Sequence, residues 1–320
     1  MKTTTYKKLF LLAALPALML ASCSKEEMTG EPGGSPDTQP GEIRFEIGFA
    51  PQDGAINATP GGATSDVPQT RVVTDSEFRS TWEAGDAIGI FACDADTDEL
   101  VIENEKLIYT GSAWESRNIL YWRGRRLKFY AYYPYDVNAN APTAIAFQAK
   151  SDQSGTTGTG ALQRSDYSLS DLMTATDAGG KSAGETVSLA FEHRFAMIQV
   201  EVPSPVKDWD PVNPMTVHLR GVQTGAMLNL TGGSAPAAQA TGGTGSVKMH
   251  LAGKPGKEGY SNYTYRAVVP VQTLKSGEDL FLISDKGTLY KGSGPDTDLE
   301  LTAGEVAVFI RLLPAESGNN

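Results

Sequence analysis

An acidic run near residue 100 has the spacing of a calcium-binding loop. Asp94, Asp96 and Asp98 alternate along the chain, and Glu105 follows eleven residues after the first of them. In 12-residue loops, oxygen ligands at such positions wrap around Ca²⁺. Glu99 departs from this pattern, because its position needs a glycine for the sharp turn, and the flanks resemble strands. We therefore favour a solvated acidic connection without a cofactor, with Ca²⁺ as the alternative.

Two other sets of side chains could support catalysis. Glu83 and Asp86 in TWEAGD are two carboxylic acids, and glycoside hydrolysis needs such a pair about 5 to 10 Å apart. The favoured alternative is that Trp82 packs in the core while Gly85 and Asp86 turn into the next strand. The histidines lack metal-ligand spacing and are interpreted as structural: His193, His218 and His250. The sequence therefore predicts no enzyme and no catalytic residues.

Cys23 lies where an apolar segment ends and a polar chain begins. Three lysines precede the apolar run 9–21, which is shorter than the roughly 20 residues of a membrane-spanning helix. This layout predicts a signal peptide over residues 1–22. The sequence Leu20-Ala21-Ser22 before the cysteine resembles a bacterial lipobox, which implies that Cys23 carries palmitate-type acyl chains as a membrane anchor. An ordinary secreted protein is the alternative.

Acidic residues dominate the chain that remains after signal removal. Residues 1–22 contain three lysines and no acid, so 24 basic residues face 38 acidic ones, a net charge of −14. Nucleic acid would need basic patches to bind its phosphates. The composition therefore argues against nucleic acid as a partner.

Alternating apolar residues predict that the folded part consists of β-strands. In EIRFEIGFA, residues 43, 45, 47 and 49 are apolar while their neighbours are polar or glycine. Further strand signals cover 87–91, 106–110, 126–135, 143–148, 186–193, 196–202, 215–222, 246–252, 263–271, 279–284, 288–292 and 305–313. No long helical stripe occurs, and 34 glycines and 18 prolines punctuate the strands. The pattern indicates an all-β sandwich.

Loose segments between the strands suggest the domain organisation. Residues 23–41 are rich in Pro, Gly and polar residues, which predicts a flexible tether. A Gly-rich stretch at 176–185 divides the rest, so we expect an N-terminal lobe at 42–180 and a C-terminal lobe at 186–314. The apolar phase shifts between 191 and 198, which predicts a bulge or break there.

An ordered series of segments resembles the fimbrillin family of Bacteroidetes, the Mfa-like and FimA-like proteins. The segments are TRVVTDSEFRSTWEAGDAIGIFAC (70–93), ENEKLIYTGSAWES (103–116), ILYWRGRRLKFYAYYPY (119–135), SDLMTAT (170–176) and LAFEHRFAMIQVEV (189–202). The runs 265–290 and 299–313 resemble the family's C-terminal end. Together these segments cover most of the folded chain.

The resemblance implies two tandem transthyretin-like, Greek-key β-sandwich lobes and a structural role. Family members are stalk, anchor or tip subunits of type V pili, which support adhesion and biofilm formation. The implied partners are other fimbrillin subunits, the outer membrane through the lipid on Cys23, and a host or bacterial surface ligand. Residues 24–27, SKEE, resemble a lipoprotein export signal, so we expect an outer-membrane anchor at the cell surface or in a fimbrium.

Strand addition is the assembly mechanism that the resemblance implies. A protease cuts after an arginine, the first strand leaves, and a neighbour's strand fills the groove. Arg71 in QTRVV is the best-placed arginine, although it could remain uncleaved, as in the family's anchor subunits. The donor strand would be the C-terminal run, in which four residues share one face: Val306, Val308, Ile310 and Leu312. The alternative, which we favour for this run, is the last core strand of the second lobe.

A second class of function is a stand-alone surface module that binds a glycan or host protein and does not polymerise. Its ligand could stack on an aromatic set, although most of these rings are expected in the core: Tyr121, Trp122, Tyr130, Tyr132, Tyr133 and Tyr135.

Overall fold

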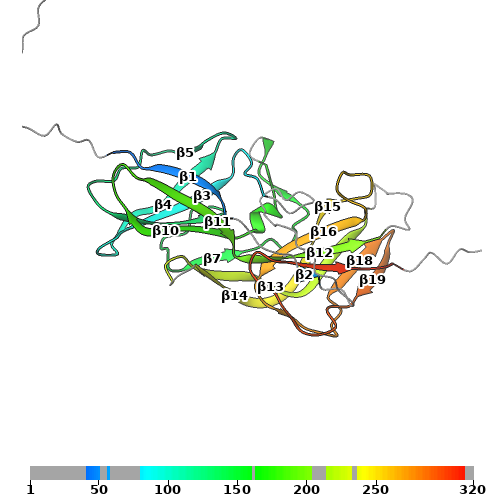
Figure 1. The fold of residues 1–320 in the computed structure, drawn as a ribbon. Helices are drawn as coiled ribbons and strands as arrows, with labels where there is room; N and C mark the ends of the chain where they lie inside the picture. Colours follow the sequence, from blue (N-terminus) through cyan, green and yellow to red (C-terminus); the bar gives the residue numbers. More distant parts are fainter. Residues whose placement is uncertain are drawn as a thin grey trace, which may run out of the picture. The chain divides into compact units, whose positions relative to one another are not determined.

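Strands make up nearly all of the regular structure of this protein (Figure 1). The computed structural model describes residues 41–50, 56–57, 80–160, 163–203, 214–232 and 236–313. Within these ranges the secondary structure is almost entirely β, with a short 3-10 helix η2 (Ser168–Ser170). The predicted all-β fold is confirmed. In the described part of the chain there is no helix with the length and apolar character needed to cross a bilayer.

Seven strands form the first sheet. In spatial order they are β1 (Arg44–Phe49), β11 (Thr186–His193), β10 (Met173–Lys181), β6 (Leu127–Tyr133), β3 (Ala87–Asp94), β4 (Leu100–Tyr109) and β5 (Trp114–Ser116). Strand β1 runs parallel to β11, and Phe45 and Ile47 lie opposite Val187 and Leu189. Burial alternates strictly along β11, as expected for a strand with one face on a core.

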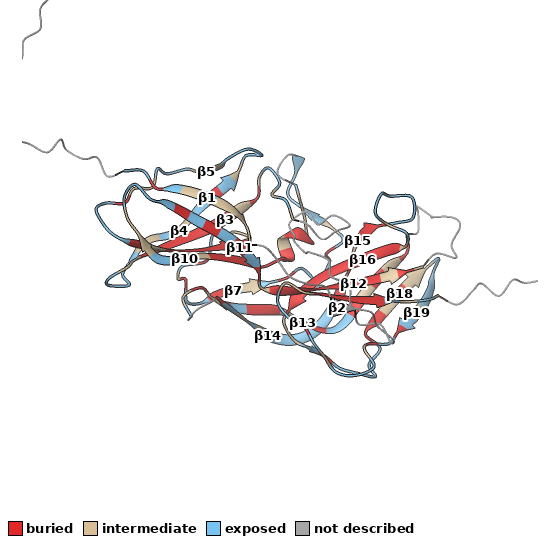
Figure 2. Ribbon diagram, in the orientation of Figure 1, coloured by how far each residue is buried: buried red, intermediate tan, exposed pale blue. Residues whose placement is uncertain are grey.

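Two further sheets enclose a second core. One contains β15 (His250–Gly253), β16 (Tyr263–Pro270), β12 (Phe195–Val202), β21 (Val306–Ile310) and β2 (Ile56–Asn57). The other contains β14 (Ala237–Lys248), β13 (Thr216–Asn229), β18 (Phe281–Asp285) and β19 (Thr288–Gly292), with β7 (Ile145–Gln148) also paired to β13. Ile198 and Phe309 from the first of these sheets pack in one cluster with Leu219 and Phe281 from the second. Figure 2 shows β12, β16 and β21 as largely buried strands.

Short strand pairs complete the structure. Strands β8 (Thr156–Thr157) and β9 (Arg164–Ser165) form one hairpin. Strands β17 (Thr273–Leu274) and β20 (Leu299–Glu300) form the other pair.

Sheet pairing does not follow the boundary expected between residues 180 and 186. Strand β11, expected at the start of the C-terminal lobe, pairs with β1 and β10 of the first sheet, because Val187, Leu189 and Phe191 face the first core. The chain leaves that sheet at Arg194, between β11 and β12, where the predicted break in apolar phase is confirmed. Conversely, β7 lies within 42–180 but pairs with β13.

A third apolar cluster joins the sheets. Phe91 and Tyr132 of the first sheet pack in it with Phe195 and Val268 of the second. Gln153, fully buried, completes the backbone hydrogen bonds of Val268: its Nε2 donates to the carbonyl at 2.8 Å, and its Oε1 accepts from the N–H at 2.9 Å. Residues Pro40–Asn320 accordingly fall into one compact unit.

Candidate functional site

Two N-terminal strands complete two different sheets, and they are the candidate site. Strand β1 is the edge of the first sheet beside β11, and β2 is an edge beside β21, parallel in both cases. Both precede Arg71 in the sequence, although Arg71 itself lies outside the described residues, as does Cys23. One stretch of chain therefore supplies strands to both sheets.

Strand β1 covers the first core with aromatic side chains. Phe45 meets Phe129 edge to face at 5.8 Å between ring centroids, and Phe49 stacks on Trp82 at 4.5 Å. Just before the strand, Ile43 is buried and donates its N–H to the carbonyl of Leu120 at 2.8 Å. Burial of apolar surface contributes about 25 cal/mol per Å². Because Phe45, Ile47 and Phe49 are half-buried against the first core, the strand contributes to the stability of that core.

Strand β21 lies in the second sheet between β12 and β2. Val306 and Val308 are buried and pack with Met197 on one face of the strand, and Phe309 enters the core on the other. The shared face predicted for these valines is confirmed. Beyond them, Ile310 is 42% exposed and Leu312 is 79% exposed. In this chain the proposed donor run is thus a core strand with an exposed apolar end, and its use as a donor stays a prediction.

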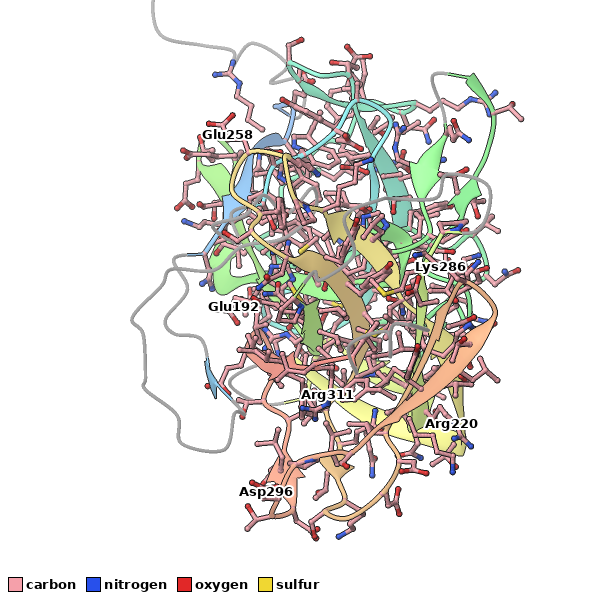
Figure 3. The ribbon with its side chains drawn as sticks, turned by 90° about the vertical axis from the view of Figure 1, so that its right-hand side faces the viewer. Glu192, Arg220, Glu258, Lys286, Asp296 and Arg311 are labelled. Carbon is pink, nitrogen blue, oxygen red and sulfur yellow. The ribbon has the colours of Figure 1, made fainter. Side chains whose placement is uncertain are left out.

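An arginine fixes the end of β21. Arg311 directly follows the strand (labelled in Figure 3). Its guanidinium lies over the rings of Phe281 and Phe309, at 5.2 Å from each centroid, and it donates to the carbonyl of Ser293. Burial lowers the pKa of Arg311. Since cation–π contacts strengthen when the cation is desolvated, Arg311 holds the strand end against the core.

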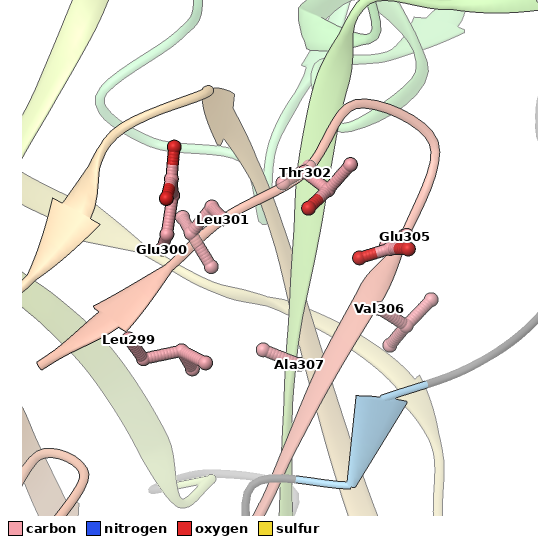
Figure 4. A pocket seen from close by; sticks show the side chains of 8 residues that line it. Leu299, Glu300, Leu301, Thr302, Glu305, Val306 and Ala307 are labelled. Atoms are coloured by element: carbon pink, nitrogen blue, oxygen red, sulfur yellow. The ribbon is translucent and has the colours of Figure 1, made fainter. Parts of the chain in front are cut away.

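A small pocket lies at the start of β21, beside β20 (Figure 4). Its lining includes Leu299, Leu301, Val306 and Ala307, and its volume is about 10 Å³. This is room for about one water molecule, so the pocket does not qualify as a ligand site.

The acidic run forms ion pairs with basic residues that follow it by about 30 positions. Asp96 meets Arg126 at 3.1 Å, and Asp98 meets Lys128 at 2.9 Å. In addition, Glu99 meets Arg125 at 2.9 Å, and the Asp94 carboxylate accepts the N–H groups of Asp96 and Thr97, which lower its pKa. Such ion pairs between exposed side chains agree with the solvated acidic connection favoured for this run.

Glu105 points to a different neighbourhood, where it accepts from Ser116 and Asn118. Among the described residues, no group of three or more His, Cys, Asp or Glu side chains could hold a metal ion. The geometry therefore gives the calcium alternative no support.

The TWEAGD segment is a structural turn. Asp86 is buried, and its carboxylate accepts from the Glu83 N–H at 2.7 Å and lies 3.5 Å from Arg164 Nε. Burial raises the pKa of Asp86 to about 6, against the opposing effects of these neighbours. The Glu83 side chain is exposed instead, and Gly85 has the left-handed φ of 95° that the turn needs. This arrangement agrees with the favoured structural interpretation of the two acids.

Trp82, the second residue of the TWEAGD segment, packs against several aromatic rings. It lies within 5.5 Å, between centroids, of four other rings: Phe49, Trp114, Tyr133 and Phe191. Its expected role in the core is confirmed.

Each of the three histidines has its own structural surroundings. His193 is buried, with Nδ1 3.0 Å from the Asp171 carboxylate. His250 stacks on Tyr167 at 5.1 Å, and burial lowers its pKa to about 4. His218 is half-buried in β13, and burial lowers its pKa as well. These surroundings agree with the structural interpretation of the histidines.

Most of the aromatic set considered for glycan stacking is inside the protein. Trp122, Tyr130, Tyr132 and Tyr133 are buried, so they cannot stack on a ligand; Tyr121 and Tyr135 are half-buried.

The sequence did not reveal β2 or the pairing of β7 with β13. Strand β2 has only two residues, too few for an alternating pattern, and side-chain alternation does not identify a strand's partner.

Comparisons with known proteins agree with this architecture of β-sheets packed face to face. Residues 70–309 match the family described as fimbrillin-like. The chain belongs to this family. A candidate fimbrium tip subunit of Bacteroides ovatus, Fim1C, is 31% identical over 215 residues, which cover 62% of this chain and 35% of that protein.

Two solved structures share the fold. A candidate cell adhesion protein from Bacteroides ovatus has 19% identity and a TM-score of 0.52, covering 86% of this chain and 92% of its own. A candidate cell adhesion protein from Bacteroides uniformis has 18% identity and a TM-score of 0.50, covering 74% and 90%.

Proposed function

We propose that this protein is a structural or adhesive subunit of a type V pilus that assembles by strand addition. The observation that carries the proposal is the position of β1 and β2, which are edges of two sheets and both precede Arg71. A single cut after Arg71 would detach both strands from the rest of the chain.

Loss of the two strands would create an acceptor for a partner. Strand β11 would lose its parallel neighbour, and β21 would become an edge. The apolar residues under β1, including Trp82 and Phe129, would lose their cover. An extended strand from a second subunit would satisfy the freed backbone groups and restore the apolar cover. The C-terminal run that contains Ile310 and Leu312 is the proposed donor.

The proposed location follows from the signal sequence and the relatives. Acylation of Cys23 would hold the chain at the outer membrane, and the polar residues 24–41 would act as the tether. Fim1C is described as a fimbrium tip subunit, and by analogy we place this chain in a fimbrium or at the cell surface as a non-enzymatic subunit.

The experiment that tests this function is an Arg71→Ala substitution in cells that display the protein. Wild-type protein is expected to form high-mass ladders that resist SDS, and the variant should remain a single uncleaved band. Arg44→Ala is the matched control, because Arg44 lies within β1, is exposed and should not be needed for cleavage. Ladders of wild-type intensity from Arg71→Ala would contradict the proposed cleavage site.

A further inference from the structure

A groove lies between β7 and the segment that follows β6. Its volume is about 560 Å³. One side consists of Pro134, Tyr135, Asp136 and Val137; the other consists of Ala146, Phe147, Gln148 and Lys150, with Leu169 of η2 also in the lining. A cavity of this size, with apolar and aromatic walls and a few polar groups, has the character of a binding site.

The side of the groove that β7 forms is an open β-edge. Strand β7 pairs antiparallel with β13 on one side (Figure 1). The N–H of Ala149 donates to the carbonyl of Thr224 at 2.9 Å. In an antiparallel pair, alternate residues direct their backbone groups to the partner strand. Residues 145, 147 and 149 therefore bond to β13, and the N–H and C=O groups of Ala146 and Gln148 point into the groove.

A neighbouring contact supports this assignment. Lys150 has the same parity as Ala146 and Gln148, and its N–H donates outward to Ser170 Oγ at 2.9 Å. Within the described residues, the outward backbone groups of Ala146 and Gln148 have no such partner. The Gln148 side chain folds back, since its Nε2 donates to Thr224 Oγ1 at 2.6 Å, and it leaves the edge accessible.

The opposite wall is held in place before any ligand binds. The carbonyl of Asp136 accepts from Asn104 Nδ2 at 2.8 Å and from the Tyr132 hydroxyl at 3.0 Å. One face of the Tyr135 ring is covered by the Lys106 ammonium, 5.1 Å from the centroid. A preformed wall lowers the ordering cost of binding.

We propose that this groove binds an extended peptide segment of a partner protein, which adds as one strand to the open edge of β7. The outward groups of Ala146 and Gln148 are two residues apart, the repeat at which an extended chain presents its own backbone groups. Val137 is 75% exposed and would cover an apolar side chain of the peptide.

Two charged side chains line the groove, Asp136 and Lys150. The Asp136 carboxylate already accepts from the N–H and Nδ2 of Asn138, so Lys150 is the charge that favours a peptide with an acidic residue. The ammonium of Lys150 is exposed and has no ion-pair partner within the described residues. The proposal goes beyond the pilus role and does not depend on cleavage at Arg71, because β7 is separate from the strands that the cut would release.

The test is selection of random seven-residue peptides, displayed on phage, against the purified full-length chain. Selected sequences are expected to alternate apolar and polar residues and to include an acidic one. Synthetic copies are then measured by fluorescence anisotropy with two variants. Ala146→Pro removes the outward N–H but no bond to β13, and should weaken binding at least tenfold. Leu289→Ala changes an exposed residue of β19 outside the groove and should bind as the wild type does.

A second measurement needs no protein variant, so a fold defect in Ala146→Pro cannot obscure the result. Peptides N-methylated at alternate bonds lose the donors that pair with β7, and they should bind at least tenfold more weakly than the unmodified peptides. Equal binding of methylated and unmodified peptides, or a selection without any binding sequence, would overturn the proposal.

Discussion

Trp82 joins several strands of the first core through its aromatic contacts. It contacts four aromatic rings from four separate strands, and one of these rings, Phe49, belongs to the N-terminal strand that we propose is released. Aromatic pairs contribute beyond their buried area, by about 0.5–1.5 kcal/mol each. Trp82 therefore couples the stability of the core to the presence of β1.

Replacing this residue should be costly. Trp82→Ala is expected to lower the free energy of unfolding by about 3–5 kcal/mol, because a large cavity remains among the rings. Urea unfolding measures the change. Leu289→Ala is the control, since Leu289 is 63% exposed and its loss should alter stability by about 0.5 kcal/mol or less. Equal effects of the two substitutions would contradict the central packing role of Trp82.

Asp86 makes stability depend on pH. Its pKa is raised from 3.8 to about 6 in the folded state, chiefly by burial, so the folded protein binds more protons than the unfolded chain between these values. Stability from this group therefore falls as pH rises from 4 to 6. The full effect is on the order of 3 kcal/mol.

Asp86→Asn isolates this contribution, because the amide does not titrate. The free energy of unfolding of the wild type minus that of the variant should fall by about 3 kcal/mol between pH 4 and pH 7. Chemical denaturation at several pH values gives this difference. A difference that stays constant with pH would show that Asp86 does not titrate as described.

At the scale of elements, the segment after β7 fastens one sheet to another. The Gln153 side chain forms hydrogen bonds with both the N–H and the carbonyl of Val268 in β16. In a longer sheet, a neighbouring strand would form these two bonds. Leaving a buried donor or acceptor unpaired costs about 1–3 kcal/mol. Gln153→Ala should therefore lower the free energy of unfolding by about 3 kcal/mol in urea denaturation.

An exposed glutamine provides the control for that measurement. The side chain of Gln163 donates to Thr156 at the surface, and Gln163→Ala should change stability by about 0.5 kcal/mol or less. Similar losses of unfolding free energy in both variants would contradict the claim that the buried hydrogen bonds of Gln153 stabilise the protein.

The elements also show which features could be predicted from the sequence. The strand at 43–49 and the shared face of Val306 and Val308 were predictable, because alternation is a local property. The sheet memberships of β7 and β11 were not, since they depend on long-range pairing. The ion pairs of the acidic run were not predictable either, because its basic partners, such as Arg126 and Lys128, follow about 30 residues later in the sequence.

At the scale of the whole molecule, the N-terminal segment has a double role. It completes two sheets at once through β1 and β2, and the same chain region contains the proposed signal peptide, Cys23 and Arg71. Removal of the proposed signal peptide would leave a net charge of −14. Anchoring, retention of the fold and activation for assembly would thus all depend on the first 71 residues.

The central claim is that cleavage after Arg71 converts this chain into a polymerising subunit. The most direct test is N-terminal mass mapping of the protein retained on cells and of the protein in SDS-resistant ladders. We predict a new N-terminus at Val72 in the ladders and acylated Cys23 in the unassembled form. A chain that begins at Cys23 in all fractions, with no ladder, would contradict the claim.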